Sequence, residues 1–562
     1  MQYLSNQQPM TDVDDLKDKY FIQADDASPP ERPEPPTYED SSVEALLDGA
    51  AYYSDLQAEI DQLESGDFLY LAGWLMDLIG FFSGDWGEGA SGSAVFEATD
   101  DFALTPDSDP LRIVLREKSE AGVDVRVLPW FSWSLIDRHQ SLPSIIGDEL
   151  EESRLGAYLD VNRSNALVAD NLRGVQALQK SCCLNILSHP VGAVHAKLVV
   201  LGDTDDSIAY TGGLDLSESR RDSTMHPDAP ENDPDADRWG YHDVQAKVRG
   251  PAVQDCYDLF RQMWNEILDM WRGKMQVKLG DDTFQTVIVN TYERGTDEVP
   301  DRDIGGAIDS SSLHLQSLRT LPVLKSLPLA RELVSNDLSF TAEDAGLFTV
   351  EHGWLKAIDH ATEYLYMEDQ YLWSHDIMSA IGSQMQAESS LKVILVGNSF
   401  NRVNEWALWE GIVSQLSDDE LDRLRVFARD AIMVHSKTTL IDDEWALIGS
   451  ANCARRSLYT DFEQSYSIID PDGSFLPDYR CDLWGDNFRM DVDDRSSLAN
   501  LDEALHIWND DWGTDSLSVT RPDTLIDVTD QISERDMSGL AESIHDTVRD
   551  PDSRETSGGV FL

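Results

Sequence analysis

Short apolar stretches of strand length recur along the middle of the chain. Residues 68–71 and 364–367 are apolar and partly aromatic, and residues 123–128 and 391–396 follow them after helix-like stretches. Runs of about four to eight β-branched and aromatic residues favour strands. Strands that alternate with helices are typical of an α/β architecture, so we predict an α/β sandwich fold.

The same order of elements occurs twice. In each half, the two strand candidates precede a short histidine motif, which runs into a third apolar strand and then a glycine-containing turn. Such repetition indicates an internal repeat. We therefore expect two pseudo-symmetric α/β sandwich lobes with both histidine motifs in one active-site cleft between them. Two unrelated α/β domains are the alternative.

The ends of the chain differ from its middle in composition. Residues 1–45 are rich in Asp, Glu and Pro, which predicts a disordered, acidic N-terminal arm, and residues 516–562 predict an acidic C-terminal tail. Between them we place a first lobe at residues 46–272, a connecting segment at residues 273–345 and a second lobe at residues 346–515.

The strongly negative net charge of the chain bears on which partners it can bind. Its 562 residues are 41% hydrophobic and carry a net charge of −62, from 105 acidic against 43 basic residues. A surface this acidic repels phosphate-bearing partners. Halophilic proteins show the same composition, and in about 1 M salt a Debye length of about 3 Å screens most of the repulsion. We favour the halophilic interpretation, under which the charge says little about the substrate.

The chain carries neither a disulfide framework nor a membrane span. Its five cysteines, of which Cys182 and Cys183 are adjacent, fit no zinc signature. Residues 1–20 have no apolar signal core, and the longest apolar stretch, residues 68–82, is interrupted by Asp77 and is too short to cross a bilayer. We expect a soluble cytoplasmic protein.

The second histidine motif is the sharper one. It runs HSKTTLID from His435 to Asp442, and a turn with Ser450 and Asn452 follows it. Because alternate residues of a strand face the same side, His435 and Lys437 should point together into a site. The lysine supplies a positive charge, and the histidine can attack phosphorus or donate a proton. The turn can place a hydroxyl and an amide near a phosphate oxygen.

The first motif is a looser copy of the second. It holds His195 and Lys197, but Asp203 comes one residue late, and Gly213 and Asp215 stand where the second motif has a serine and an asparagine. A lone histidine is usually a satisfied structural residue, and short motifs need context. Two copies that share a strand and a glycine turn favour a catalytic role.

With these motifs, the sequence resembles the phospholipase D superfamily, and the eukaryotic-type phospholipase D branch in particular. The resemblance covers roughly residues 67–488. Further segments that look like that branch stand in its order at residues 212–216, 221–222, 239–243, 260–265, 366–371 and 480–488.

The resemblance implies a phosphodiesterase that hydrolyses phospholipid headgroups, with transphosphatidylation as a further reaction. His195 would be the nucleophile and form a phosphohistidine, and His435 would first protonate the leaving alcohol and then deprotonate water or an acceptor alcohol. The phosphate would be bound by two lysines and by residues of the turns: Lys197, Lys437, Asn452, Ser450 and Gly213. Asp203 and Asp442 complete the motifs, and we expect them to brace loops.

A nucleophilic histidine needs an acceptor that fixes its tautomer. In this family, acidic residues downstream of each motif have that role. The candidates are Asp222 in the first half and Asp461 or Glu463 in the second, and which acid pairs with which histidine stays open. We interpret Asp215 as structural or as a further partner to a histidine.

We expect no metal or cofactor, because two lysines supply the charge, and we assign the acidic clusters to a solvated surface and not to calcium sites. The expected partner is phospholipid at a membrane surface, which the protein meets peripherally. An internal pair of motifs completes the site without a dimer, so we expect a monomer.

Three alternatives remain. A nuclease on the same fold would need a basic groove, which a lysine-poor chain disfavours. A cardiolipin-synthase-like phosphatidyltransferase would usually carry membrane segments. An inactive scaffold relative is disfavoured by two intact His-x-Lys pairs, although the shifted Asp203 and the aspartate at Asp215 keep it open.

Overall fold

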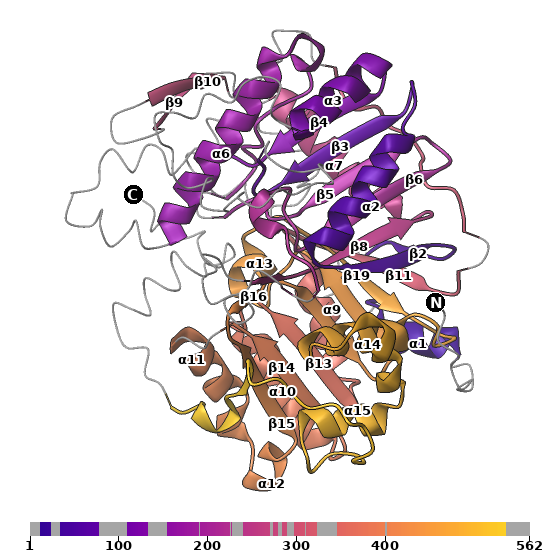
Figure 1. Ribbon diagram of the computed structural model, residues 1–562, viewed down its shortest axis with the longest axis vertical. Helices are drawn as coiled ribbons and strands as arrows, with labels where there is room; N and C mark the ends of the chain where they lie inside the picture. The colour runs from indigo at the N-terminus through magenta and orange to yellow at the C-terminus, as the bar shows by residue number, and fades with distance from the viewer. Residues whose placement is uncertain are drawn as a thin grey trace, which may run out of the picture.

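The fold was analysed in a computed structural model. The structure describes residues 12–23, 34–77, 110–132, 154–189, 192–224, 226, 240–269, 274–278, 284–288, 297–308, 311–322, 346–398 and 402–534. Two lobes follow one another, the first in indigo and magenta and the second in orange and yellow (Figure 1). The prediction of two α/β lobes is confirmed.

The first lobe is built on a six-stranded sheet with the order β2-β8-β6-β5-β3-β4. Its strands are β2 (Ser42–Leu47), β3 (Phe68–Gly73), β4 (Asp124–Pro129), β5 (Leu198–Gly202), β6 (Ser207–Gly212) and β8 (Val244–Arg249). Only β3 and β4 run parallel. Its helices are α2 (Asp48–Gln62), α3 (Pro110–Ala121), α6 (Arg154–Gly174) and α7 (Val253–Asp269).

The second lobe is built on a ten-stranded sheet with the order β1-β11-β19-β18-β17-β13-β14-β15-β20, in which β12 also pairs with β11. Its strands are β1 (Thr37–Tyr38), β11 (His314–Leu321), β12 (Leu347–Phe348), β13 (Tyr364–Asp369), β14 (Lys392–Gly397), β15 (Leu424–Arg429), β17 (Lys437–Ile441), β18 (Trp445–Gly449), β19 (Glu463–Ile469) and β20 (Leu525–Asp527). Its helices are α1 (Val13–Tyr20), α9 (Thr349–Ile358), α10 (His375–Ala387), α11 (Arg402–Gly411), α12 (Asp418–Leu421), α13 (Arg455–Tyr459), α14 (Leu476–Asn487) and α15 (Leu501–Trp508).

The two sheets share one topology. The order β4-β3-β5-β6-β8-β2 of the first lobe matches the order β14-β13-β17-β18-β19-β11 of the second, and in both series only the first pair is parallel. The apolar runs predicted as strands lie in β3, β4, β13 and β14. Both histidine motifs therefore enter equivalent strands, β5 and β17.

A small parallel pair of strands joins the lobes. β7 (Gly240–His242) of the first half pairs with β16 (Ile432–Val434) of the second, so that His242 lies opposite Val434. The next residue after β7 is Asp243, and the next after β16 is His435. This pair therefore brings chemistry from both halves to one place. A separate hairpin is formed by β9 (Lys274–Lys278) and β10 (Phe284–Ile288).

The predicted boundaries need correction at three places. Part of the arm predicted to be disordered is helix α1, which packs against α9 and β19 of the second lobe (Figure 1). The same arm contributes β1 to the second sheet and most of β2 to the first. Strand β11 lies in the predicted connecting segment and β20 in the predicted tail, yet both belong to the second sheet.

The reason is local. The arm is acidic on average, but Leu16, Tyr20, Phe21 and Ile22 are all buried in the second core. Four apolar side chains on one short segment suffice to dock it, and a composition average conceals them. Among the described residues, no helix is long and apolar enough to cross a membrane. All five cysteines are buried free thiols.

Candidate active site

His195 is held at the junction by the second lobe. Its backbone N–H donates to the carbonyl oxygen of Phe462 over 3.0 Å, just before strand β5 begins. Its Nδ1 lies 3.0 Å from Oε1 of Glu463, the first residue of β19, and 3.1 Å from the carbonyl oxygen of Ser450. The acid that contacts the first-motif histidine therefore comes from the other lobe.

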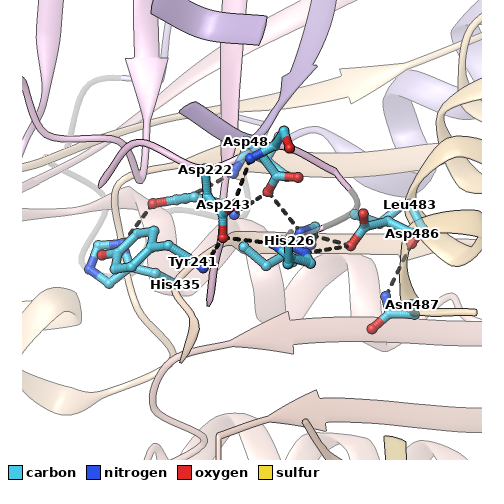
Figure 2. A network of polar contacts seen from close by, with 12 residues as sticks. Asp48, Asp222, His226, Tyr241, Asp243, His435, Leu483, Asp486 and Asn487 are labelled. Atoms are coloured by element: carbon cyan, nitrogen blue, oxygen red, sulfur yellow. Dashed lines mark hydrogen bonds and ion pairs between the residues drawn. The ribbon is translucent and has the colours of Figure 1, made fainter. Parts of the chain in front are cut away.

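His435, which belongs to the second lobe, is held by residues of the first lobe. Its backbone N–H donates to the carbonyl oxygen of His242 over 2.8 Å, and its Nδ1 lies 2.7 Å from Oδ2 of Asp243 (Figure 2). Asp243 lies between β7 and β8 of the first lobe and is fully buried. Each motif histidine thus pairs with a carboxylate of the opposite lobe.

This crosswise pairing fixes how each ring can react. A carboxylate at Nδ1 accepts the Nδ1 proton and leaves Nε2 with its lone pair. Nε2 is then the atom of each ring that can attack phosphorus or carry a proton. Glu463 and Asp243 do not need to touch a substrate to do this, so they are positioning residues.

The two motifs meet in one site, since Nδ1 of His195 lies 3.1 Å from the carbonyl oxygen of Ser450 in the turn after the second motif. Burial lowers the pKa of the His195 imidazole well below its usual value, and Lys197 and Lys437 lower it further. Burial also lowers the pKa of His435 well below its usual value. The charge of Lys437 lowers it further, and smaller contributions come from Lys197 and His195. Cations of both motifs therefore act on both histidines. In the absence of an anionic substrate, both rings are neutral at neutral pH, as a nucleophile must be.

The carboxylates respond to the same burial. Desolvation raises the pKa of Asp243 to about 7, although Lys437 opposes this rise. Desolvation, and then the charge of Asp461, raise the pKa of Glu463 well above its usual value. Each histidine–carboxylate pair therefore shares a proton more evenly than an exposed pair would.

The two lysines are buried and lie along the backbone of the histidines. Lys197 Nζ donates to the carbonyl oxygen of His195 over 2.8 Å and lies 3.4 Å from Oδ1 of Asp215. Lys437 Nζ donates to the carbonyl oxygen of His435. Burial lowers the pKa of Lys437 to about 8. Two buried ammonium groups beside two neutral imidazoles form a receptor for an anion.

The turns contribute differently from the sequence prediction. Ser450 was expected to donate to phosphate, but its hydroxyl donates to Glu463 Oε2, so it supports the acid instead. Asn452 is 3% exposed, and its Oδ1 has no hydrogen-bond partner among the described residues. Because an amide oxygen only accepts, this atom is open to a group that donates, and a phosphate oxygen would have to be bound through the Nδ2 donor of the same amide.

Gly213 makes room for an acid and not for phosphate. A Cβ at this position would lie 1.9 Å from Oδ1 of Asp243. Because any side chain would push Asp243 away, only glycine lets this carboxylate reach His435. The sequence prediction of a phosphate-binding role for Gly213 is therefore replaced by a packing role.

Of the four acids predicted to orient a histidine, only Glu463 contacts His195 or His435. Asp222 Oδ2 lies 2.9 Å from Nδ1 of His226. Asp461 pairs with Arg456 and accepts from the backbone of Ala193. Asp215 pairs with Lys197 and Arg220, so its carboxylate is neutralised by cations.

The motif aspartates brace turns, as we expected. Asp203 Oδ1 accepts the backbone N–H groups of Asp205 and Asp206, each over 2.7 Å. Asp442 accepts the backbone N–H groups of Thr362, Glu363 and Tyr364, each over 2.8 Å, and has a left-handed φ of 57°. These contacts hold the ends of the strands that carry the lysines.

Three residues close to the histidines were not predicted as site residues. Asp243 was missed because it precedes His435 by 192 residues, whereas acids downstream of each motif were expected. Tyr241 has its ring centroid 5.1 Å from that of His435, and Trp74 lies 6.1 Å from His195 by the same measure. The signal available for Asp243 was its place in the segment 239–243 that carried the resemblance.

The comparisons with known proteins identify the family of the chain. The family model described as phospholipase D matches residues 105–395, more than half of the chain, and includes His195. The family model described as cardiolipin synthase, PLD-like domain, matches residues 354–479 and includes His435. The chain belongs to the phospholipase D superfamily.

Its curated relatives are distant. Phospholipase D beta 2 of Arabidopsis thaliana is 21% identical over 493 residues, which are 67% of this chain and 52% of that protein. Cardiolipin synthase 2 of Staphylococcus epidermidis is 24% identical over 278 residues, which are 49% of this chain and 44% of that protein. The chain spans about half the length of these relatives.

A similar solved structure is the phosphatidylserine synthase of Haemophilus influenzae Rd KW20. It has a TM-score of 0.41 and 12% sequence identity over 78% of this chain and 85% of that chain.

The packing of Gly213 gives a first prediction. Gly213→Ala should lower kcat about 10²-fold, because a displacement of about 1 Å in a positioning group has an effect of that size. The measurement is kcat for phosphodiester cleavage beside the melting temperature. The control is Gly174→Ala, where a Cβ would meet no atom within 4 Å. Equal kcat for both variants would contradict the role of Gly213.

The depressed pKa of Lys437 gives a second prediction. This lysine is charged below a pKa of about 8 and loses its charge as the pH rises through that value. Because kcat/KM reports the free enzyme, it should fall about tenfold per pH unit above about pH 8. Lys437→Arg should move this limb to higher pH, while Lys247→Arg, on strand β8, where the lysine pairs with Asp55 and Glu59, should leave it in place. A flat profile of the parent to about pH 10 would refute the assignment.

Proposed function

We propose that this protein is a phospholipase D-type phosphodiesterase, which hydrolyses phospholipid headgroups through a phosphohistidine intermediate. The observation that carries the proposal is the crosswise pair of histidines. Glu463 orients His195 and Asp243 orients His435, and the buried Lys197 and Lys437 each donate to the backbone carbonyl oxygen of the histidine in their own motif. Two-step displacement at a phosphodiester needs one nucleophile and one group that alternates as acid and base.

In the first step, Nε2 of His195 attacks phosphorus, the bond from phosphorus to the headgroup oxygen breaks, and His435 gives that oxygen a proton. His435 must be protonated at this point, although its pKa is lowered before substrate binds. An anionic diester beside the ring favours the imidazolium, so substrate binding raises the pKa of His435.

In the second step, neutral His435 accepts a proton from water, the water oxygen attacks phosphorus, and the bond to His195 breaks. The products are phosphatidate and the free headgroup alcohol. An alcohol in place of water would give transphosphatidylation. Lys197, Lys437 and the Nδ2 donor of Asn452 stabilise the charge on the non-bridging oxygens in both steps.

A phosphatidyltransferase is the second candidate, because the same intermediate serves both outcomes. The curated relatives include phospholipases D of Arabidopsis thaliana and a cardiolipin synthase of Staphylococcus epidermidis. A nuclease is disfavoured, since a chain with net charge −62 repels a polyanion far more than a single diester.

We further propose that the protein meets phospholipid peripherally as a cytoplasmic monomer, and that its acidic composition suits high salt. One chain supplies both motifs, which is why a single copy can complete the site.

The test is headgroup release from phospholipid vesicles in about 1 M salt, with a primary alcohol added in a parallel reaction. Release of headgroup without alcohol supports the hydrolase, and exclusive transfer to the alcohol supports the transferase. Supercoiled plasmid is the control substrate. Cleavage of plasmid, with no headgroup released from any lipid by folded protein, would refute the proposal.

A further inference from the structure

Next to the His435–Asp243 pair lies a second cluster that the mechanism does not use. Asp48, His226, His242 and Asp486 each offer one ligand atom, and these atoms all lie within 4.8 Å of one another. Figure 2 shows Asp48, His226 and Asp486 in this cluster. All four side chains are buried. Asp486 lies on α14 of the second lobe, and the other three belong to the first half, so the cluster spans both lobes.

The distances within the cluster suit a shared cation better than separate hydrogen bonds. His242 Nδ1 lies 3.0 Å from Asp48 Oδ1 and 3.1 Å from Asp486 Oδ2, and His226 Nε2 lies 3.5 Å from the same Asp486 oxygen. A ring N–H shared between two acceptors makes two bent, weakened hydrogen bonds. Four donor atoms from four residues that converge in this way are the usual arrangement around a metal ion.

The outer nitrogens of both rings are already bonded to further carboxylates. His226 Nδ1 lies 2.9 Å from Asp222 Oδ2, and His242 Nε2 lies 2.9 Å from Glu368 Oε1. A carboxylate behind a ligating histidine is the usual outer-shell partner at metal sites, since it orients the ring and leaves the inner nitrogen with its lone pair. This explains why the predicted acid Asp222 is committed to His226.

The cluster carries excess negative charge when its imidazoles are neutral. The buried or nearly buried carboxylates are Asp48, Asp222, Glu368 and Asp486, and the guanidinium groups on Asp486 are Arg429 and Arg495. With neutral imidazoles, four negative and two positive groups leave two negative charges, which one dication would balance. Without a metal ion the two imidazoles balance them instead, since the surrounding carboxylates outweigh burial and raise the pKa of His226 to about 9 and the pKa of His242 well above its usual value. Oδ2 of Asp48 is also buried and has no hydrogen-bond partner among the described residues.

We propose that Asp48, His226, His242 and Asp486 bind one divalent transition-metal ion of the zinc class. Two imidazole and two carboxylate donors match the nitrogen and oxygen ligands of tetrahedral Zn²⁺. Calcium is disfavoured because it takes about six to eight oxygen ligands.

The ion has a positioning role. Asp243 directly follows His242, and its backbone N–H donates to Asp48 Oδ1 over 3.1 Å. The backbone of His435 in turn donates to the carbonyl oxygen of His242. A metal ion would therefore join the lobes and fix the acid and the histidine that form one of the two catalytic pairs, without contacting the substrate.

The test is metal content by mass spectrometry of untagged full-length protein, before and after exposure to zinc. The parent should hold about one equivalent per chain, and its melting temperature should fall by at least about 3 °C on chelation and recover with zinc. His226→Gln and Asp48→Asn should lose the ion, whereas His506→Gln should keep it.

One further variant separates this site from the catalytic pair. His435→Ala should lose activity and keep its metal, so failure of the proposed function and failure of the metal site give different results. Folded parent that holds less than about a tenth of an equivalent of any metal, and whose melting temperature zinc does not change, would overturn the proposal. The cluster would then be a network of protonated histidines and carboxylates.

Discussion

Replacing either His195 or His435 with alanine is expected to lower the rate of headgroup release by at least about 10⁴-fold. The first change removes the nucleophile, and the second removes the group that serves as acid and then as base. Neither residue can stand in for the other, because each is locked at Nδ1 by its own carboxylate. The measurement is initial release of headgroup from vesicles at saturating lipid.

The control for both changes is His506→Ala, which removes an imidazole that bonds the carbonyl oxygen of Trp512 on the far end of the second lobe. This variant should keep the activity of the parent within about threefold. If His195→Ala or His435→Ala retained more than about a hundredth of the activity while folded, the two-histidine mechanism would be wrong.

The second large effect is expected at Asp243. Asp243→Asn should lower kcat by about 10³- to 10⁴-fold, because an amide can donate to Nδ1 of His435. This favours the tautomer with the proton on Nε2, which then cannot accept a proton from water in the second step. Histidine–aspartate pairs of other enzymes lose activity on this scale. KM should change much less than kcat, since Asp243 does not contact substrate.

The matched control is Asp203→Asn. Among the described residues, this carboxylate accepts only from backbone N–H groups of its own turn, so its loss should leave kcat within about threefold. A metal assay of Asp243→Asn should match the parent, because Asp243 is not a ligand of the proposed ion. A kcat for Asp243→Asn close to that of Asp203→Asn would show that the crosswise pairing does not serve catalysis.

The strands and both motifs could be predicted because each depends on a short, continuous stretch of sequence. Apolar runs at residues 68–71 and 364–367 became β3 and β13, and Lys437 begins a strand as its motif suggested. The equal order of these elements in both halves was enough to predict two lobes. Local patterns need no knowledge of how the lobes dock.

The pairing of acids and histidines could not be predicted, because it depends on that docking. Asp222 and Glu463 stand at similar offsets from the two histidines, so the sequence treats them alike. In the fold, Glu463 reaches across to His195, whereas Asp222 turns to His226. Asp243, the true partner of His435, comes close only through the parallel strands β7 and β16.

Turn residues were misjudged for a related reason. Ser450 and Gly213 stand beside the motifs in sequence, which suggested contact with phosphate. The serine hydroxyl instead supports Glu463, and the glycine leaves space for Asp243. Both residues therefore help to position an acid, Glu463 or Asp243. The sequence alone does not show that these acids lie next to the turns.

The central claim is that His195 becomes covalently bonded to phosphorus while the lobes hold His435 beside it. The most direct measurement mixes the parent with a short-chain phospholipid, quenches in alkali during turnover, and locates the added mass by peptide mass spectrometry. We predict a phosphatidyl group on the peptide that contains His195, and none in His195→Ala. An adduct on His435, or turnover of the parent with no adduct at either histidine, would contradict the account.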